Sequence, residues 1–255
     1  MSDPSFTIIP IPGMPMVEAG DNLAMQILDA MAAQNLSPQA GDILCLAQKI
    51  VSKAEGQLID LATIEPSPEA VKLAQETDKD PRLVELILAE STEVLRQRKG
   101  VLIVRHNLGL VGAHAGIDQS NVDHGSGEKA LLLPKDPDAS ASAIRAAVKE
   151  ETGLAVGVII TDSHNRPWRM GTIGAAIGSA GITVLDDHRG GSDVYGRELK
   201  VTLINRADAL AAAATLGMGE TTEKIPLVLI RGLPAEESDQ NAQMINRPLE
   251  EDLFR

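Results

Sequence analysis

Two aspartates are the residues of this sequence best suited to metal chemistry. Asp118 lies in a polar segment, and Asp162 directly follows the apolar run 156–161. Ligands and metals in α/β proteins collect beyond the carboxyl ends of strands, and Mg²⁺ or Mn²⁺ prefers carboxylate and phosphate oxygens. The hydroxyl of Ser163 and the carboxylate of Glu220 are further candidate ligands. These positions predict a site for a hard cation, while the alternative is that each aspartate only caps a turn.

Basic residues near these aspartates could bind anions. In the segment 48–56, QKIVSKAEG, two lysines and a serine follow an apolar strand and could hold phosphates as point charges. The alternative for this segment is an ordinary solvated start of a helix. Arginine suits phosphate and carboxylate recognition, and the arginines in polar segments are Arg166, Arg169, Arg189 and Arg197. Some of them are expected to pair with nearby aspartates such as Asp186, Asp187 or Asp193.

The standard nucleotide-binding and catalytic motifs are absent from the sequence. The segment 125–130, GSGEKA, lacks the glycine spacing and the final Ser or Thr of a P-loop. The glycines of 171–181 do not match the dinucleotide fingerprint, and close packing of backbone segments is the alternative for them. The five histidines lack zinc-ligand spacing, and no GxSxG elbow is present. The single cysteine, Cys45, lies in an apolar run and is interpreted as a small buried hydrophobe.

Composition excludes several classes of function. The net charge of −13 would repel nucleic acids and anionic membranes, so neither is an expected partner. One Trp, one Tyr and two Phe are too few for recognition of bases by aromatic stacking. No apolar run approaches the roughly 20 residues that span a bilayer, and the start of the chain does not resemble a signal peptide. A cytoplasmic enzyme with an aliphatic core is therefore predicted.

Apolar periodicity predicts the elements that position these residues. The expected strands are 6–11, 43–46, 100–105, 108–115, 156–161, 199–204 and 225–230. The expected helices are 22–34, 66–90 with a break near 80–81, 137–152 and 207–216. Asp21 is the predicted cap of the first helix, and the polar tail after Pro234 is predicted to be partly disordered. Because strands and helices alternate irregularly, the sequence predicts an α/β or α+β fold with a mixed sheet.

Several segments, taken in order, resemble the F420 γ-glutamyl ligases, the family of coenzyme F420-0:L-glutamate ligases. They are 10–16 (PIPGMPM), 48–56 (QKIVSKAEG), 115–122 (AGIDQSNV), 157–166 (GVIITDSHNR), 171–181, 193–199 (DVYGREL) and 218–220 (MGE). The resemblance implies a distinct mixed α/β fold that is not a P-loop, Rossmann or ATP-grasp fold. It also implies a homodimer, with one ligase domain over 1–235 that could comprise two intertwined subdomains, followed by a polar tail at 236–255.

The same resemblance implies the residues of the site. The nucleotide GTP would be bound by Gly13, Met14, Pro15, Met16, Gln48, Lys49, Lys53, Asn121, Met218 and Gly219, with the loop extending to Ile225. Divalent Mg²⁺ or Mn²⁺, with K⁺ as a further ion, would be held by Asp118, Asp162, Ser163 and Glu220. Ser163 stands where the family usually has Thr, and Met170 follows Arg169 where the family has a second basic residue. The candidate substrate-binding residues are Arg166, Arg169, Arg189 and Arg197.

The implied activity is GTP-dependent ligation of L-glutamate to the phospholactyl carboxylate of coenzyme F420-0 through an acyl phosphate, with further γ-linked additions. Positioning and electrostatics carry phosphoryl transfer, so such a reaction needs no protein nucleophile. Two other functions remain open on the sequence. One is a metal-dependent phosphohydrolase that acts on a small phosphorylated metabolite, and the other is a non-catalytic dimeric nucleotide-binding protein.

Overall fold

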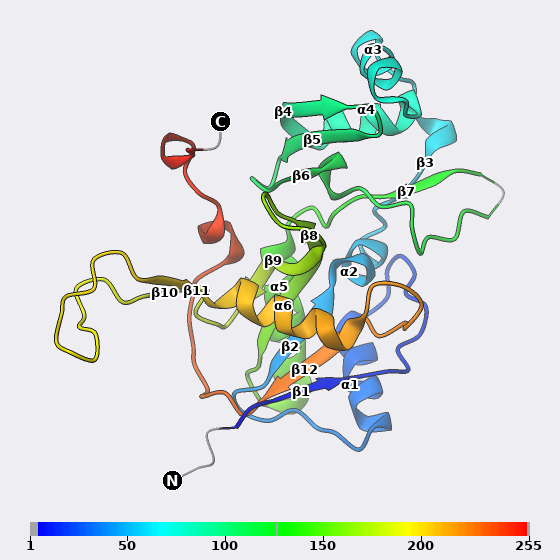
Figure 1. Ribbon diagram of the computed structural model, residues 1–255. Coiled ribbons are helices and arrows are strands. Elements are labelled where there is room, and N and C mark those ends of the chain that lie inside the picture. Colours follow the sequence, from blue (N-terminus) through cyan, green and yellow to red (C-terminus); the bar gives the residue numbers. More distant parts are fainter. Residues whose placement is uncertain (1–4, 126, 254–255) are drawn as a thin grey trace.

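The fold is built on a five-stranded mixed sheet. The computed structural model describes residues 5–125 and 127–253; Ser126 of the glycine-rich segment, residues 1–4 and residues 254–255 lie outside the described part. The strand order is β1 (Thr7–Pro10), β12 (Leu227–Arg231), β2 (Ile43–Ala47), β8 (Gly157–Asn165) and β9 (Thr172–Ala180) (Figure 1). Strands β2 and β8 run parallel, while the other neighbouring pairs are antiparallel. The predicted mixed sheet is therefore confirmed.

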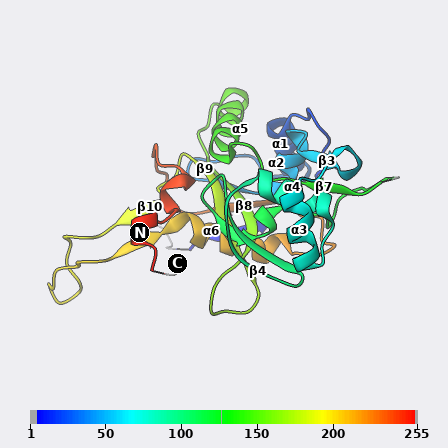
Figure 2. The same ribbon diagram turned by 90° about the horizontal axis from the view of Figure 1, so that it is seen from above.

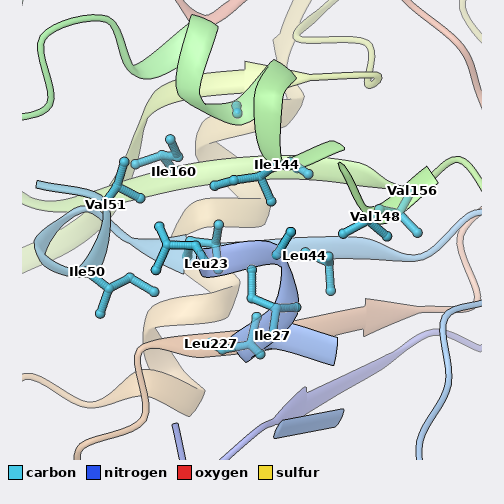
Figure 3. Packing of buried hydrophobic residues seen from close by; sticks show 14 of the residues in the cluster. Leu23, Ile27, Leu44, Ile50, Val51, Ile144, Val148, Val156, Ile160 and Leu227 are labelled. Atoms are coloured by element: carbon cyan, nitrogen blue, oxygen red, sulfur yellow. The ribbon is translucent and has the colours of Figure 1, made fainter. Parts of the chain in front are cut away.

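Helices cover both faces of this sheet. Figure 2 shows α1 (Leu23–Ala33), α2 (Gln48–Ala54) and α5 (Pro137–Thr152) on one side and α6 (Arg206–Met218) on the other. Side chains of β2 alternate between the two layers, as the pleat of a strand requires. Leu44 and Leu46 pack with α1 and α5, whereas Ile43 and Cys45 pack with α6. Figure 3 shows the first of these layers, an aliphatic core in which Leu23, Ile27 and Ile144 meet the sheet.

A second lobe stands beyond one end of the sheet (Figure 1). It contains β4 (Ser91–Arg98), β5 (Val101–His106) and β6 (Val111–Ala113), with α3 (Pro68–Thr77) and α4 (Pro81–Ala89) packed against them. The pair β3 (Leu58–Asp60) and β7 (Lys129–Leu131) and the pair β10 (Leu185–Asp187) and β11 (Leu203–Asn205) complete the strands of the described residues. The 3₁₀ helices are η1 (Leu61–Thr63), η2 (His114–Gly116), η3 (Ala242–Ile245) and η4 (Leu249–Glu251). Within the described ranges, no helix is long and apolar enough to cross a membrane.

Several predicted boundaries need correction. The cap of α1 is Asn22, whose side chain accepts from the Met25 amide at 3.2 Å, whereas Asp21 accepts from Glu18 and Gln26. Strand β8 does not stop before Asp162 but continues to Asn165, because β9 pairs with it over its whole length. The strand expected at 199–204 is limited to β11, and β4 was not predicted at all.

The glycines of β9 have a packing role, as one of the two interpretations of that segment proposed. A Cβ on Gly174 would lie 2.3 Å from the carbonyl oxygen of Ala211 on α6, and a Cβ on Gly178 would lie 2.4 Å from the carbonyl oxygen of Pro137 on α5. Real Cβ atoms do not approach backbone so closely. These two glycines therefore let β9 lie directly between the two helices.

The polar tail is held against the protein rather than disordered over its described length. The Gln240 side chain accepts from the backbone amides of Val184 and Leu185 at 2.7 and 2.8 Å. Asp138, in the first turn of α5, accepts from the amide of Ala242 at 2.8 Å. Asn246 donates to the carbonyl of Leu108 in the second lobe at 2.9 Å. The tail thus connects the sheet to the second lobe.

Candidate functional site

A cavity of about 410 Å³ opens where β2 ends and its parallel pairing with β8 stops, beside the outer part of β8 that continues to Asn165. Ala47 and Thr161 are register partners at this edge, so the residues that follow them enter the same space. The lining comes from 14–17, 47–50 with 53, 121–123, 161–163, 215, 218–221 and 223–226. Polar groups at the carboxyl ends of parallel strands form the usual ligand site of an α/β sheet.

The cavity brings together most of the predicted site residues. Those that line it are Met14, Pro15, Met16, Gln48, Lys49, Lys53, Asn121, Asp162, Ser163, Met218, Gly219 and Glu220. Gly13 lies in the turn just before this lining, with a φ of +89°. Asp118 does not line the cavity; it lies behind Lys49, which does. Segments far apart in the sequence therefore converge on one space.

Asp118 is tied to α2 by charge and hydrogen bonds. Its carboxylate lies 2.5 Å from the Lys49 ammonium and accepts from the amide and hydroxyl of Ser120 at 2.8 and 2.6 Å. Burial alone would raise the pKa of Asp118, but the bonds from Lys49 and Ser120 outweigh it and hold this pKa below its usual value. Lys53 makes a parallel contact by donating to the Asn121 carbonyl at 3.2 Å. Both lysines thus bridge from α2 to the segment that carries Asp118.

Asp162 has the opposite electrostatic character. Desolvation raises its pKa to about 7, although a hydrogen bond from the Ser163 amide opposes the shift. The nearby charges of Asp118 and Glu220 raise the pKa further, while Lys49 lowers it. Asp162 and Asp118 are therefore close enough to sense each other's charge across the same site. A partly buried carboxylate of this kind is strongly stabilised by a nearby cation.

The oxygen donors at this site suit a hard cation whose coordination is completed by a bound ligand. Within the described ranges, no three His, Cys, Asp or Glu side chains are grouped closely enough to hold a metal alone. Two carboxylates and the Ser163 hydroxyl supply oxygen donors, and Mg²⁺ commonly takes only one or two protein carboxylates beside phosphate oxygens and water. The raised pKa of Asp162 and the cation already paired with Asp118 indicate that this place favours positive charge. The residues present therefore fit a divalent cation held jointly with phosphate.

The segment 48–53 starts a helix, α2, as one interpretation predicted, but the start of this helix is largely buried rather than solvated. Gln48 is 2% exposed and Ser52 is completely buried, and the two side chains are hydrogen-bonded at 2.8 Å. Thr161, which the sequence analysis did not identify, is 2% exposed and also lines the cavity. The signal that could have found Thr161 is the pairing of its strand with β2, and that pairing cannot be read from a single segment.

The loop after α6 closes the remaining side of the cavity. Helix α6 ends at Met218, and Gly219 then adopts a φ of +72°, which favours glycine. The Glu223 carboxylate turns back to accept from the Thr221 amide at 2.8 Å. This bond and other backbone amides hold the pKa of Glu223 below its usual value. Glu223 belongs to the loop up to Ile225 that the resemblance assigned to the site, whereas Asp123 is an acidic lining residue that the sequence analysis did not assign.

The four candidate substrate-binding arginines do not line this cavity. Arg166 and Arg169 lie at the tip of the β8–β9 hairpin, where Arg166 donates to the Gly171 carbonyl at 3.2 Å. Arg189 and Arg197 lie in the long excursion between β10 and β11, which projects from the body of the protein (Figure 1). Arg189 is paired with Asp187 at 2.6 Å, as one interpretation expected for some of the arginines.

Cys45 has no role in this chemistry. It is completely buried in the α6 layer of the core, and burial raises the pKa of its thiol to about 12. The thiolate is therefore not formed near neutral pH, which agrees with its interpretation as a small hydrophobe.

Comparisons with known proteins agree on one family. Residues 13–232 match the family model described as F420-0:Gamma-glutamyl ligase. The chain is 45% identical to the coenzyme F420:L-glutamate ligase of Methanothermobacter thermautotrophicus, over 98% of this chain and 99% of that protein. It is 44% identical to the protein of that name from Methanopyrus kandleri, over 99% of this chain and 98% of that protein. The Methanocaldococcus jannaschii protein of that name is 41% identical, over 95% and 94% of the two chains.

Proposed function

This chain belongs to the F420-0:γ-glutamyl ligase family, and from that premise we propose that it uses GTP to join L-glutamate to the phospholactyl carboxylate of coenzyme F420-0. It is a ligase, as the sequence resemblance predicted. The observation that carries the rest of the proposal is the convergence of Lys49, Lys53 and Asp162 where β2 ends beside β8. Two ammonium groups beside a carboxylate are a suitable setting for a phosphate chain and its counter-cation.

In this proposal the lysines exchange partners when the nucleotide binds. Lys49 leaves Asp118, Lys53 leaves the Asn121 carbonyl, and both ammonium groups turn to phosphate oxygens. The carboxylates of Asp118 and Asp162 and the Ser163 hydroxyl would hold Mg²⁺ or Mn²⁺, and the cation would neutralise charge on the phosphates. Desolvation lowers the pKa of Lys53, so pairing with a phosphate would restore stabilisation that its buried ammonium lacks.

The chemical steps follow from the need to activate a carboxylate. The lactyl carboxylate attacks the γ-phosphorus of GTP, which forms an acyl phosphate and releases GDP. The amine of L-glutamate then attacks the acyl carbon, forms the amide and expels inorganic phosphate. The side chains at the cavity orient and neutralise the reactants, so no covalent protein intermediate is needed. Further γ-linked glutamates would be added by the same steps.

Mass spectrometry of the deazaflavin tests this activity directly. After incubation with GTP, L-glutamate and Mn²⁺, we expect the deazaflavin to gain glutamyl residues, and release of GDP to require both co-substrates. Release of phosphate without the deazaflavin and glutamate would instead support the phosphohydrolase. Calorimetric titration with GTP and Mn²⁺ that gives heat of binding, without turnover of any kind, would support the non-catalytic protein. A parallel incubation with ATP determines whether the nucleotide is GTP.

A homodimer completes the proposal. Large apolar side chains stand almost fully exposed on the two projecting loops: Trp168 and Met170 on the β8–β9 hairpin, and Val194 and Tyr195 between β10 and β11. Such clustered exposure is typical of a surface that another protein covers. The same loops carry the candidate substrate-binding arginines, so a second copy of the chain could bring those arginines to a cavity. Sedimentation should give a dimer for the wild type and a monomer for the double variant Val194→Ser, Tyr195→Ser.

A further inference from the structure

Three polar side chains are buried together at the inner end of the cavity. Gln48 and Thr161 are each 2% exposed, and Ser52 is completely buried. Thr161 is the register partner of Ala47, the residue directly before Gln48, so Gln48 and Thr161 lie next to each other where β2 ends beside β8. Both of them line the cavity. Polar groups in such positions normally have hydrogen-bond partners.

Two of these three side chains have a polar atom without a hydrogen-bond partner among the described residues. The Ser52 hydroxyl donates to Gln48 Oε1 at 2.8 Å, which fixes the side-chain amide in one orientation. Gln48 Nε2 has no hydrogen-bond partner among the described residues, and neither has Thr161 Oγ1. An amide nitrogen can only donate, so any partner that Gln48 Nε2 gains must be an acceptor. A threonine hydroxyl can donate to the same kind of atom.

The Ser52 contact differs from the usual behaviour of serine in a helix. The side chain of a mid-helix serine usually either points to solvent or bonds to the backbone carbonyl four residues earlier. Ser52 instead reaches the side chain of residue 48, one turn back, and so contributes to the orientation of a cavity group rather than to the helix backbone. The neighbouring Lys49 and Lys53 already face the same cavity with positive charge.

We propose that Ser52 is a positioning residue that orients Gln48, so that Gln48 Nε2 and Thr161 Oγ1 donate to acceptor oxygens of the bound nucleotide. This inference rests on the proposed function, since it names how that site binds its nucleotide. The acceptor oxygens belong either to phosphate or to the carbonyl group of the base. Preorganised donors favour binding because the amide does not have to be reoriented when the ligand arrives.

A double-mutant cycle on GDP binding tests the coupling between Ser52 and Gln48. Calorimetry with the full chain and Mn²⁺ should show GDP bound about three- to tenfold more weakly by Ser52→Ala, as expected for loss of one oriented hydrogen bond. Gln48→Ala should weaken binding by at least as much, and Ser52→Ala should add almost nothing in the Gln48→Ala background. A residue that only stabilises α2 would weaken binding equally in both backgrounds, and that result would overturn the proposal.

Kinetics and matched controls separate positioning from folding. Ser52→Ala should raise KM for GTP with kcat within about twofold, and Ser52→Thr, which keeps the hydroxyl, should restore KM. Thr161→Val should weaken GDP binding. Ser179→Ala removes another buried hydroxyl without a partner among the described residues, but one that lines a different cavity, and it should leave GDP binding unchanged. Equal effects of Thr161→Val and Ser179→Ala would contradict a role for Thr161.

Two further ligands identify the acceptor. Weaker binding of inorganic tripolyphosphate by Ser52→Ala assigns the acceptor to the phosphates, whereas weaker binding of guanosine alone assigns it to the base. Unchanged binding of both would overturn the proposal. The test is distinct from that of the proposed function, because the coupling between Ser52 and Gln48 can be measured with GDP even if no glutamate is transferred.

Discussion

Two aspartates near the ends of strands show how differently two regions of this protein treat charge. Asp162, on β8 in the cavity, has a pKa raised to about 7, chiefly by desolvation. Asp187, at the end of β10 on the projecting excursion, has a pKa lowered to about 2, chiefly by the hydrogen bond from the Arg189 side chain. The excursion therefore satisfies its own charge, whereas the cavity does not.

This difference in pKa indicates where a cation or anion from solution is expected to bind. A carboxylate that already has a bidentate arginine gains little from a ligand. A desolvated carboxylate near two further acidic groups gains much more from a cation. Perturbed carboxylates in a cavity are good candidates for functional groups, while those in exposed ion pairs are mostly structural. The cavity is the region in which substitutions should affect chemistry most.

The largest expected effect comes from removing the candidate metal ligands. Asp118→Ala and Asp162→Ala should each lower the rate of glutamyl transfer by on the order of a thousandfold, because the charge on the phosphates would no longer be neutralised. The rate is measured by mass spectrometry of the deazaflavin. Asp29→Ala, an exposed change on α1, serves as the control and should retain full activity. Turnover near the wild-type rate in both cavity variants would refute the assignment.

Glycine substitutions should give the next largest effect. The loss of unfolding free energy should be larger in β9, beside the cavity, than in the excursion between β10 and β11. Gly174→Ala would place a Cβ 2.3 Å from the Ala211 carbonyl oxygen and should cost about 1–3 kcal/mol of unfolding free energy, because β9 or α6 must move. Gly174 is the register partner of Ser163, so activity should fall as well. Gly190→Ala in the excursion meets open space, so only its φ of +83° should cost free energy, roughly 1 kcal/mol, the low end of the range for an L-residue in the left-handed region. Denaturant unfolding measures both values, and equal losses would contradict this difference.

A smaller effect should appear in the pH dependence of stability. The pKa of Asp162 is higher in the folded protein than its ordinary 3.8. The contribution of Asp162 to the stability of the folded protein is therefore fully present below pH 3.8 and is lost as the pH rises through about 7. Asp162→Asn should therefore raise Tm by a few degrees at pH 8, without added metal, and by less at pH 4.

The variant Asp187→Asn should change Tm in the opposite direction. Its lowered pKa means that Asp187 stabilises the fold above its ordinary pKa, and this contribution disappears as the pH falls toward about 2. The Tm of Asp187→Asn should thus be slightly lower than that of the wild type at neutral pH. A Tm difference for Asp162→Asn that does not change with pH would contradict the raised pKa.

Local signals predicted the longer helices, whereas α2 was only one of two alternatives for the segment 48–56. Pro137 at the start and Gly153 after the end delimit α5, and its observed bounds match the prediction. Local signals failed where a partner strand decides the structure. β8 continues through Asp162 because β9 lies beside it, although its polar residues suggested a loop. β4 was missed because its exposed charged residues, such as Glu93 and Arg96, hide the alternation of a strand.

The candidate site likewise combines features that the sequence predicts with features that it does not. Most of the site residues that the family resemblance implies line one cavity, from the turn at 14–16 to the loop after α6. It did not show that Lys49 is paired with Asp118, nor that Ser52 and Thr161 are buried at the inner end. These features depend on side-chain packing between segments that lie far apart in the sequence.

The attachment of the tail has a practical consequence for shortened chains. A chain that stops at residue 232, where the family match ends, would lose the Gln240 side chain that accepts from the amides of Val184 and Leu185. It would also uncover Asp138, which holds the Ala242 amide. The smallest fragment suitable for recombinant work or for fusion to another protein therefore extends at least through Asn246, past residue 232 where the family model ends.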